Sequence, residues 1–281
     1  MKKLLLPFLI FVAVGSSAQK VSSKLVFQKG QKLEIVSNVN TTTEMMMNES
    51  KNNAISTELY EVKDVTNDNI TLERSMKKIK MNISIMGQEK SIDSDNPEDL
   101  KGMIGEPIKE LLNTKNEFTV NGAGKIVAVK GSDKKKSADN GMAGMFLQQM
   151  NLGSALPAVG TASFFKVLPD YEVGKGDTWI DTLSGSGTVV KTVYTLKEVT
   201  DNDILIDYVS DGKVDTKQEM MGMSIDVKGT IKSNGAITLD RATGLLKQKT
   251  ITNKTESASN IGGQEMNINS KSTTVVTVKP I

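Results

Sequence analysis

Apolar and small side chains recur at every second residue over long stretches of this sequence. They occupy odd positions from Leu33 to Met47 and even positions from Met266 to Val278. Because successive side chains of a β-strand point to opposite faces, this alternation predicts long strands with one buried face. Strands usually have about five or six residues, so strands of this length predict a sheet that twists and curls.

The segment 70–85 has the same alternation but changes phase partway. Its apolar side chains fall on even positions as far as Met76 and on odd positions from Ile79 onward. A strand cannot turn its apolar face over without an extra residue, so the change predicts a β-bulge near Lys77 and Lys78.

One stretch of the chain occurs twice. Residues 60–70 and 194–204 align without a gap at an offset of 134 residues, and each predicts a strand, an Asn/Asp turn and a returning strand. A second match, of Met86-Gly87-Gln88 with Met221-Gly222-Met223, falls at an offset of 135 residues. Two matches in nearly the same register predict two related halves. The alternative is convergence, because a strand–turn–strand unit arises readily.

Helical patterns are confined to the middle of the chain. Asn96 is the predicted N-cap and Pro97 the first helical residue, and we expect Gly105 and Pro107 to kink the helix or split it. The apolar spacing within residues 142–150 predicts another short helix.

These patterns together predict a mainly β (α+β) fold, with long curled antiparallel strands in two related halves and a few helices in the middle of the chain. We expect a signal peptide at 1–18, a first β-rich half at 19–130, a linker with short helices at 131–170 and a second β-rich half at 171–281.

The N-terminus has the three parts of a secretory signal. Lys2 and Lys3 precede an apolar run at 4–14, and small residues follow as far as Ala18. The apolar run is shorter than the roughly 20 residues of a membrane-spanning helix, so we expect cleavage after Ala18. The predicted location is the periplasm or the extracellular space, and no later stretch is long and apolar enough to span a membrane.

The composition excludes several classes of chemistry. The sequence has no Cys and no His, which rules out Ser-His-Asp and Cys-His nucleophilic sites and ordinary zinc sites. No pair of catalytic carboxylates is recognisable, so we expect neither an enzyme nor a cofactor. The formal net charge of +2 falls to zero without Lys2 and Lys3, and aromatic residues make up 4% of the chain, so nucleic acid is not an expected partner.

Two segments carry a resemblance to known proteins. The entry strand Gly176-Asp177-Thr178-Trp179 and the hairpin residues Thr243-Gly244-Leu245, together with the signal sequence, resemble a family of exported bacterial proteins of unknown function. This resemblance implies a location in the cell envelope and no established activity. A more distant likeness, at the level of fold alone, is to periplasmic lipoprotein carriers and related lipid-binding half-barrels.

Methionine-rich strands supply the candidate ligand site. Met is flexible and suits adaptable apolar cavities, and the alternation places several Met and Ile side chains on one face. The candidate cavity residues are Met45, Met47, Met81, Ile83, Ile85, Met221, Met223 and Ile225. Two alternatives are an ordinary packed core and a thioether site for Cu(I) or Ag(I), which the absence of His disfavours. No metal residue is assigned.

Two other motifs have a structural interpretation beside a functional one. The acidic run 93–99 could bind calcium, but a helix cap accounts for the same residues. Asp177 and Trp179 could form a site, but a strand entry anchored by the single Trp is the simpler interpretation.

The sequence therefore leaves two hypotheses for function. In the first, a non-enzymatic envelope protein binds a lipid, another apolar ligand or a polypeptide in a curved β cleft. In the second, a structural or interaction protein with a solid core docks an envelope partner through its sheet edges or loops.

Overall fold

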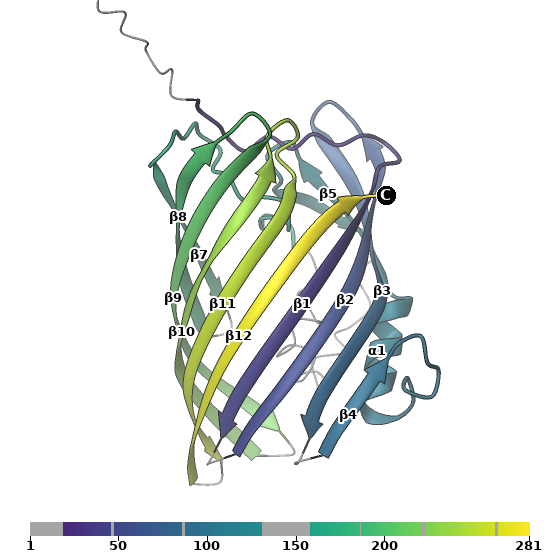
Figure 1. The fold of residues 1–281 in the computed structure, drawn as a ribbon, viewed down its shortest axis with the longest axis vertical. Coiled ribbons are helices and arrows are strands. Elements are labelled where there is room, and N and C mark those ends of the chain that lie inside the picture. Colours follow the sequence, from purple (N-terminus) through teal and green to yellow (C-terminus); the bar gives the residue numbers. More distant parts are fainter. Residues whose placement is uncertain are drawn as a thin grey trace, which may run out of the picture.

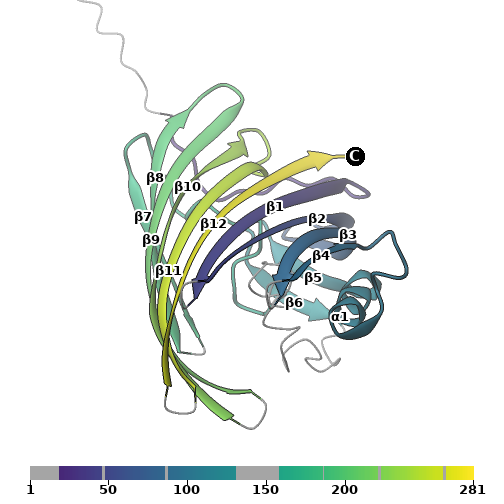
Figure 2. The ribbon, with the colours of Figure 1, turned by 60° about the horizontal axis from the view of Figure 1, so that its bottom comes forward.

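The computed structural model describes residues 19–45, 48–85, 88–130, 158–185, 187–220, 223–261 and 264–281. In these residues the chain forms one antiparallel sheet of 12 strands and one helix (Figure 1). The sheet is strongly curled, and α1 lies on its concave side (Figure 2). The elements are β1 (Lys32–Met45), β2 (Asn48–Val65), β3 (Asn69–Ile85), β4 (Gln88–Asp93), α1 (Gly102–Asn113), β5 (Lys115–Asn121), β6 (Ile126–Lys130), β7 (Thr178–Gly185), β8 (Thr188–Val199), β9 (Asp203–Met220), β10 (Met223–Asp240), β11 (Leu246–Ile261) and β12 (Gln264–Pro280).

The first and last strands of the chain pair with each other near the middle of the sheet. The order across the sheet is β6-β5-β3-β2-β1-β12-β11-β10-β9-β8-β7, and β4 pairs with β3. The strands of the two predicted halves therefore lie on either side of the β1–β12 junction and form one continuous sheet. This confirms the mainly β fold class with long curled antiparallel strands. The predicted helix at 142–150 lies outside the described residues.

The two copies of the repeated stretch fold in the same way. Thr66 and Thr200 each donate the backbone N–H to the carbonyl oxygen three residues further on, at 2.9 and 2.8 Å. The first strand of each hairpin contains one extra residue, which is Lys63 in β2 and Lys197 in β8. These four positions repeat the offset of 134 residues, so the two copies share both the turn and the bulge.

The predicted bulge in β3 is confirmed. Thr57 pairs with Lys78 and Glu58 pairs with Met76, which leaves Lys77 as the extra residue. The extra residue restores the alternation, so the apolar side chains before and after the bulge lie on the same buried face of β3.

The predicted start of the helix is wrong. Residues 94–101 form turns, and α1 begins at Gly102 rather than at Pro97. Gly102, the first residue of α1, has a φ of 80°, and this left-handed conformation interrupts the right-handed backbone, so the preceding turns remain separate from the helix. The helix then continues through Pro107 to Asn113 without splitting.

An N-terminal segment, residues 19–31, closes one end of the curled sheet. The backbone N–H of Leu25 donates to the carbonyl oxygen of Gly122 in the β5–β6 turn, and that of Val26 donates to Thr243 in the β10–β11 turn, both at 2.8 Å. The segment therefore joins a hairpin of the first half to a hairpin of the second.

The main core lies beneath this closed end. Phe165, from the connector at 158–173, is 1% exposed, and its ring meets those of Phe27 and Tyr60 edge-on at 5.4 and 5.3 Å. Apolar side chains from β1, β2, β3 and β5 join those from β7 to β12 around them. The closed end is thus the place where both halves share one core.

A second core lies on the same face of the sheet, under α1. α1 packs against β3, and Ile108 of the helix shares one buried cluster with the inward side chains of β3 and with Ile92 of β4. Among the described residues, no helix combines the length and the apolarity that crossing a membrane would require.

Candidate ligand-binding face

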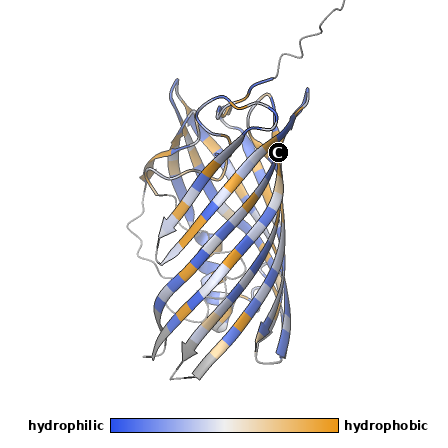
Figure 3. Ribbon diagram, turned by 90° about the vertical axis from the view of Figure 1, so that its left-hand side faces the viewer, coloured by the Kyte–Doolittle hydropathy of each residue, from blue (hydrophilic) through white to orange (hydrophobic). Residues whose placement is uncertain are grey.

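The two faces of the sheet differ sharply in charge, because hydrophilic and hydrophobic residues alternate along the strands (Figure 3). The pairing registers place the acidic and basic side chains of β1–β3 and β7–β12 on the convex face, with two exceptions. One is the set of lysines that are extra residues at bulges, Lys63, Lys77, Lys197 and Lys247, and the other is a small inward set. That inward set consists of Glu58, Arg74, Asp181 and Lys249. The concave face is therefore mostly apolar or hydroxyl-bearing, while the convex face carries the charges that keep it in water.

Glu58 and Arg74 neutralise each other on the concave face. Nε of Arg74 donates to Oε2 of Glu58 at 2.9 Å and Nη2 donates to Oε1 at 2.7 Å. This two-bond geometry is the strongest that Arg and a carboxylate can adopt. Tyr60 lies on the same face, and its burial raises the pKa of its hydroxyl far above the ordinary value.

The concave face of β8–β12, away from the closed end, forms a surface that we call the trough floor. Its side chains are partly exposed, uncharged and mostly small, so they leave room above the sheet. The trough floor consists of Val190, Thr192, Gly212, Val214, Thr216, Val227, Gly229, Ile231, Ser233, Asn253, Thr255, Ser257, Ser270 and Ser272.

An aromatic row lies between the trough floor and the closed end. Trp179 stacks on Tyr194 at 5.3 Å between ring centroids, and Tyr194 meets Tyr208 at 5.9 Å. Beside this row, Nζ of Lys249 lies 5.4 Å from the centroid of the Tyr208 ring. Burial lowers the pKa of Lys249 and raises the pKa of Tyr208.

The predicted cavity residues divide into three groups. Met81 and Ile83 are fully buried in the core under α1, whereas Met45 is 42% exposed at the end of β1. The backbones of Ile85, Met223 and Ile225 lie in β3 and β10, but their side chains are outside the described part of the structure, as are Met47 and Met221 entirely.

The residues that most distinguish the concave face were missed in the sequence. Glu58, Arg74 and Lys249 look like ordinary exposed charges in a β-strand pattern. The phase of the neighbouring apolar residues could have placed Glu58 and Arg74 on the inner face, because both are even-numbered like Tyr60 and Leu72.

The two remaining motifs have structural roles. The indole N–H of Trp179 donates to the carbonyl oxygen of Val167 at 3.2 Å, and Oδ2 of Asp177 accepts the N–H of Gly174 at 2.8 Å. In the acidic run, Asp93 pairs with Lys80. Among the described residues, no group of three or more acidic or His side chains could hold a metal ion.

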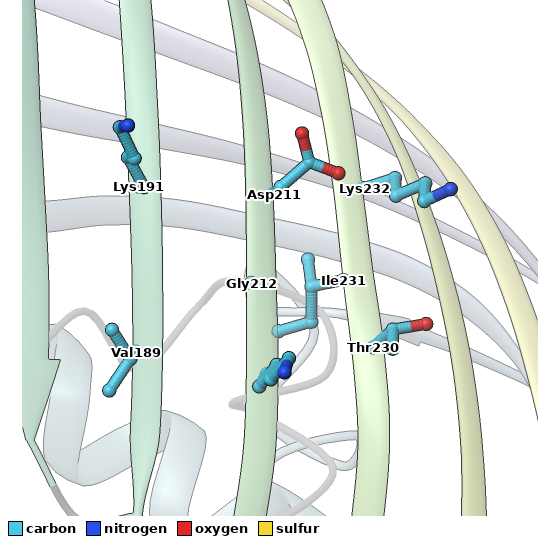
Figure 4. A pocket seen from close by; sticks show the side chains of 8 residues that line it. Val189, Lys191, Asp211, Gly212, Thr230, Ile231 and Lys232 are labelled. Carbon is cyan, nitrogen blue, oxygen red and sulfur yellow. The ribbon is translucent and has the colours of Figure 1, made fainter.

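An open hollow of about 530 Å³ lies across β8, β9 and β10. Most of its lining side chains alternate onto the convex face, and Asp211 lies between Lys191 and Lys232 there (Figure 4). The hollow therefore opens mainly on the charged convex face, although Gly212 and Ile231 of the trough floor also line it.

Fold and face together define a class of protein: a single curled antiparallel sheet with a charged convex face and an apolar, hydroxyl-lined concave face. The chain belongs to the family of unknown function DUF6263, whose model matches residues 67–246. No curated protein matches the sequence.

Among solved structures, lipovitellin, in a structure titled for its lipid–protein interactions, matches 90% of this chain with a TM-score of 0.52 and 13% identity. The chain spans 25% of the lipovitellin chain, and this likeness is one of fold alone. An outer membrane channel from Pseudomonas putida F1 matches 91% of this chain and 98% of its own, with 8% identity and a TM-score of 0.26. OpdQ from Pseudomonas aeruginosa matches 91% of this chain and 100% of its own, with 7% identity and a TM-score of 0.25.

Proposed function

We propose that this protein is a non-enzymatic carrier that holds the apolar chain of a lipid-like molecule against the trough floor. The observation that carries the proposal is the one-sided distribution of charge. A concave surface of fourteen partly exposed, uncharged and mostly small residues lies on the inside of the curl, and it presents no charge that an apolar chain would have to desolvate.

Small side chains support the same proposal. Gly212, Gly229 and Ser233 keep the floor low, and an acyl chain lying there would contact backbone and methyl groups over its length. The fold-level likeness to lipovitellin supports a lipid as the class of ligand.

Export is part of the proposal. Lys2, Lys3, the apolar run 4–14 and Ala18 form a secretory signal, so the carrier would act in the periplasm or outside the cell. The absence of Cys agrees with a protein that depends on its cores rather than on disulfides in that compartment.

The test has two steps. The protein is expressed with its own signal sequence, purified under mild conditions and examined by native mass spectrometry, which is expected to show a bound apolar molecule that solvent extraction releases. The delipidated protein is then titrated with a fluorescent fatty-acyl probe.

Two variants of neighbouring residues on β10 locate the binding surface. Ser233→Trp places an indole on the trough floor and is expected to weaken probe binding at least tenfold. Asn234→Trp places the same group on the convex face and is expected to leave binding unchanged. Thermal melts check that both variants fold. An empty wild-type protein that also fails to bind the probe would refute the proposal.

A second function is favoured by a different observation. β7 is at the end of the strand order, pairs only with β8 among the described strands, and carries Leu183 with 71% exposure. An exposed strand edge of this kind can accept a strand from an envelope partner. A photo-crosslinking amino acid at position 183 should then trap one reproducible partner in cells, and the absence of any such product would exclude this role for β7.

A further inference from the structure

We propose that Lys249 binds the anionic head group of the molecule in the trough, so that the ligand is a single-chain amphiphile ending in a carboxylate or a phosphate. This inference rests on the proposed function and deepens it, because it states which end of the ligand is recognised and where.

Lys249 faces inward because of a bulge. Leu239 pairs with Leu246 and Thr238 pairs with Gln248, so Lys247 is an extra residue in β11. The extra residue shifts the alternation by one position, so Lys249 points to the concave face. Without the bulge it would point to the convex face.

The surroundings of Lys249 are apolar. It pairs with Ile237 on β10 and with Val276 on β12, which are 2% and 6% exposed. The ammonium group reaches across β10 toward Tyr208, and Gly235, at the pairing position opposite Tyr208, contributes no side chain that would block it.

No described carboxylate balances this charge. Glu58 is bound by Arg74 and lies three strands away, which is about 14 Å along the sheet at the usual strand spacing. Asp181 is on β7, four strands away or about 19 Å. The interaction that the structure provides for the ammonium group of Lys249 is with the ring of Tyr208.

A half-buried ammonium group without a counter-charge is costly, and the lowered pKa of Lys249 has burial as its cause. An anion that binds there would recover the cost and form a charge-assisted hydrogen bond. The amphiphile's chain would continue along β11, where Lys249 to Ser257 spans about 26 Å at the usual rise per residue. That length accommodates an extended long-chain acyl group.

The test compares ligands that share a chain and differ in the head group. Hexadecanoic acid, hexadecyl phosphate and the methyl ester of hexadecanoic acid compete with a neutral fluorescent apolar probe for the delipidated full-length protein. We expect both anions to displace the probe roughly 10- to 100-fold more effectively than the ester, as the energy of a hydrogen bond to a charged group implies.

Three variants assign the preference to Lys249. Lys249→Met should remove the preference for anions and leave binding of the ester unchanged, whereas Lys249→Arg should retain most of the preference. Lys271→Met removes a lysine from the convex face of the adjacent strand and should change neither.

The outcomes separate the inference from the proposed function. If the wild-type protein binds acid and ester equally and Lys249→Met changes neither, the inference is overturned while trough binding stands. If neither the probe nor any ligand binds, both fail. A carboxylate preference without a phosphate preference, lost in Lys249→Met, supports the inference and restricts the head group to carboxylates.

Discussion

Arg74 donates two parallel hydrogen bonds to Glu58 across the β2–β3 pair, and the two side chains are only 12% and 17% exposed. The pair lies on the concave face, between the core at the closed end and the core under α1. It is thus an ion pair on a surface that is otherwise almost free of charge.

Removing one member of this pair is expected to cost more than removing both. Arg74→Met leaves the Glu58 carboxylate without its partner and should lower the free energy of unfolding by about 3 kcal/mol. The double variant Glu58→Leu with Arg74→Met should lie within about 1 kcal/mol of the wild type. Urea denaturation of the three proteins measures this, and a double variant as unstable as Arg74→Met alone would contradict it.

Lys249→Met is expected to stabilise the ligand-free protein. The pKa of Lys249 is lowered from 10.5 by burial, so at neutral pH the folded state carries an ammonium group that is better solvated in the unfolded chain. Replacing it with an apolar side chain of similar length should raise the free energy of unfolding by about 1 kcal/mol.

The pH dependence of that gain has a definite sign. Above pH 10.5, Lys249 is neutral in both the folded and the unfolded protein, so its lowered pKa does not reduce the stability of the wild type. The loss of stability grows as the pH falls toward the pKa of Lys249 in the folded state. The advantage of Lys249→Met should therefore be largest near neutral pH and vanish above about pH 10.5. Denaturation curves at several pH values measure this trend, with Lys271→Met as the control. An advantage that increased with rising pH would contradict the prediction.

Gly235→Ala is expected to be strongly destabilising. A Cβ atom at Gly235 would collide with the carbonyl oxygen of Thr250 and lie 2.8 Å from the hydroxyl of Tyr208. We expect a loss of about 2 kcal/mol or more. Gly185→Ala on β7 is the matched control, because a Cβ there meets nothing within 4 Å, and it should be neutral or slightly stabilising. Thermal melts that rank the two variants the other way would exclude this account.

Phe27→Ala should loosen the closed end of the sheet. Phe27 is 6% exposed and its ring packs against Phe165, so we expect a loss of about 3 to 5 kcal/mol. Val26→Ala, next to it and 41% exposed, should cost less than about 0.5 kcal/mol. Equal losses in chemical denaturation would show that residues 19–31 do not anchor the end of the sheet.

The bulges show how far local patterns reach. The phase change after Met76 predicts the bulge at Lys77 because both flanking segments are rich in apolar residues. The bulge at Lys247 escapes the same reasoning, since Asn253, Thr255 and Ser257 show no apolar alternation after it. The inward position of Lys249 could therefore not be recognised from sequence.

The prediction of where the helix starts was wrong for a related reason. Asn96 and Pro97 have the residue types of a helix start, and the side-chain oxygen of Asn96 accepts the N–H of Glu98 as an N-cap would. The backbone bonds that follow span three residues, from Asp99 to Asn96 and from Lys101 to Glu98, so the segment forms turns. The same residue types serve both structures, and the left-handed Gly102 decides between them.

The sequence by itself determined the long strands, their buried faces, the β3 bulge and the duplicated hairpin, because each depends on neighbours within a few residues or on a direct repeat. Only the tertiary structure decided that β1 pairs with β12, that residues 19–31 cross and close one end, and that Lys249 faces the trough. These features depend on pairing between distant segments, and alternation along one strand carries no information about which strand lies beside it.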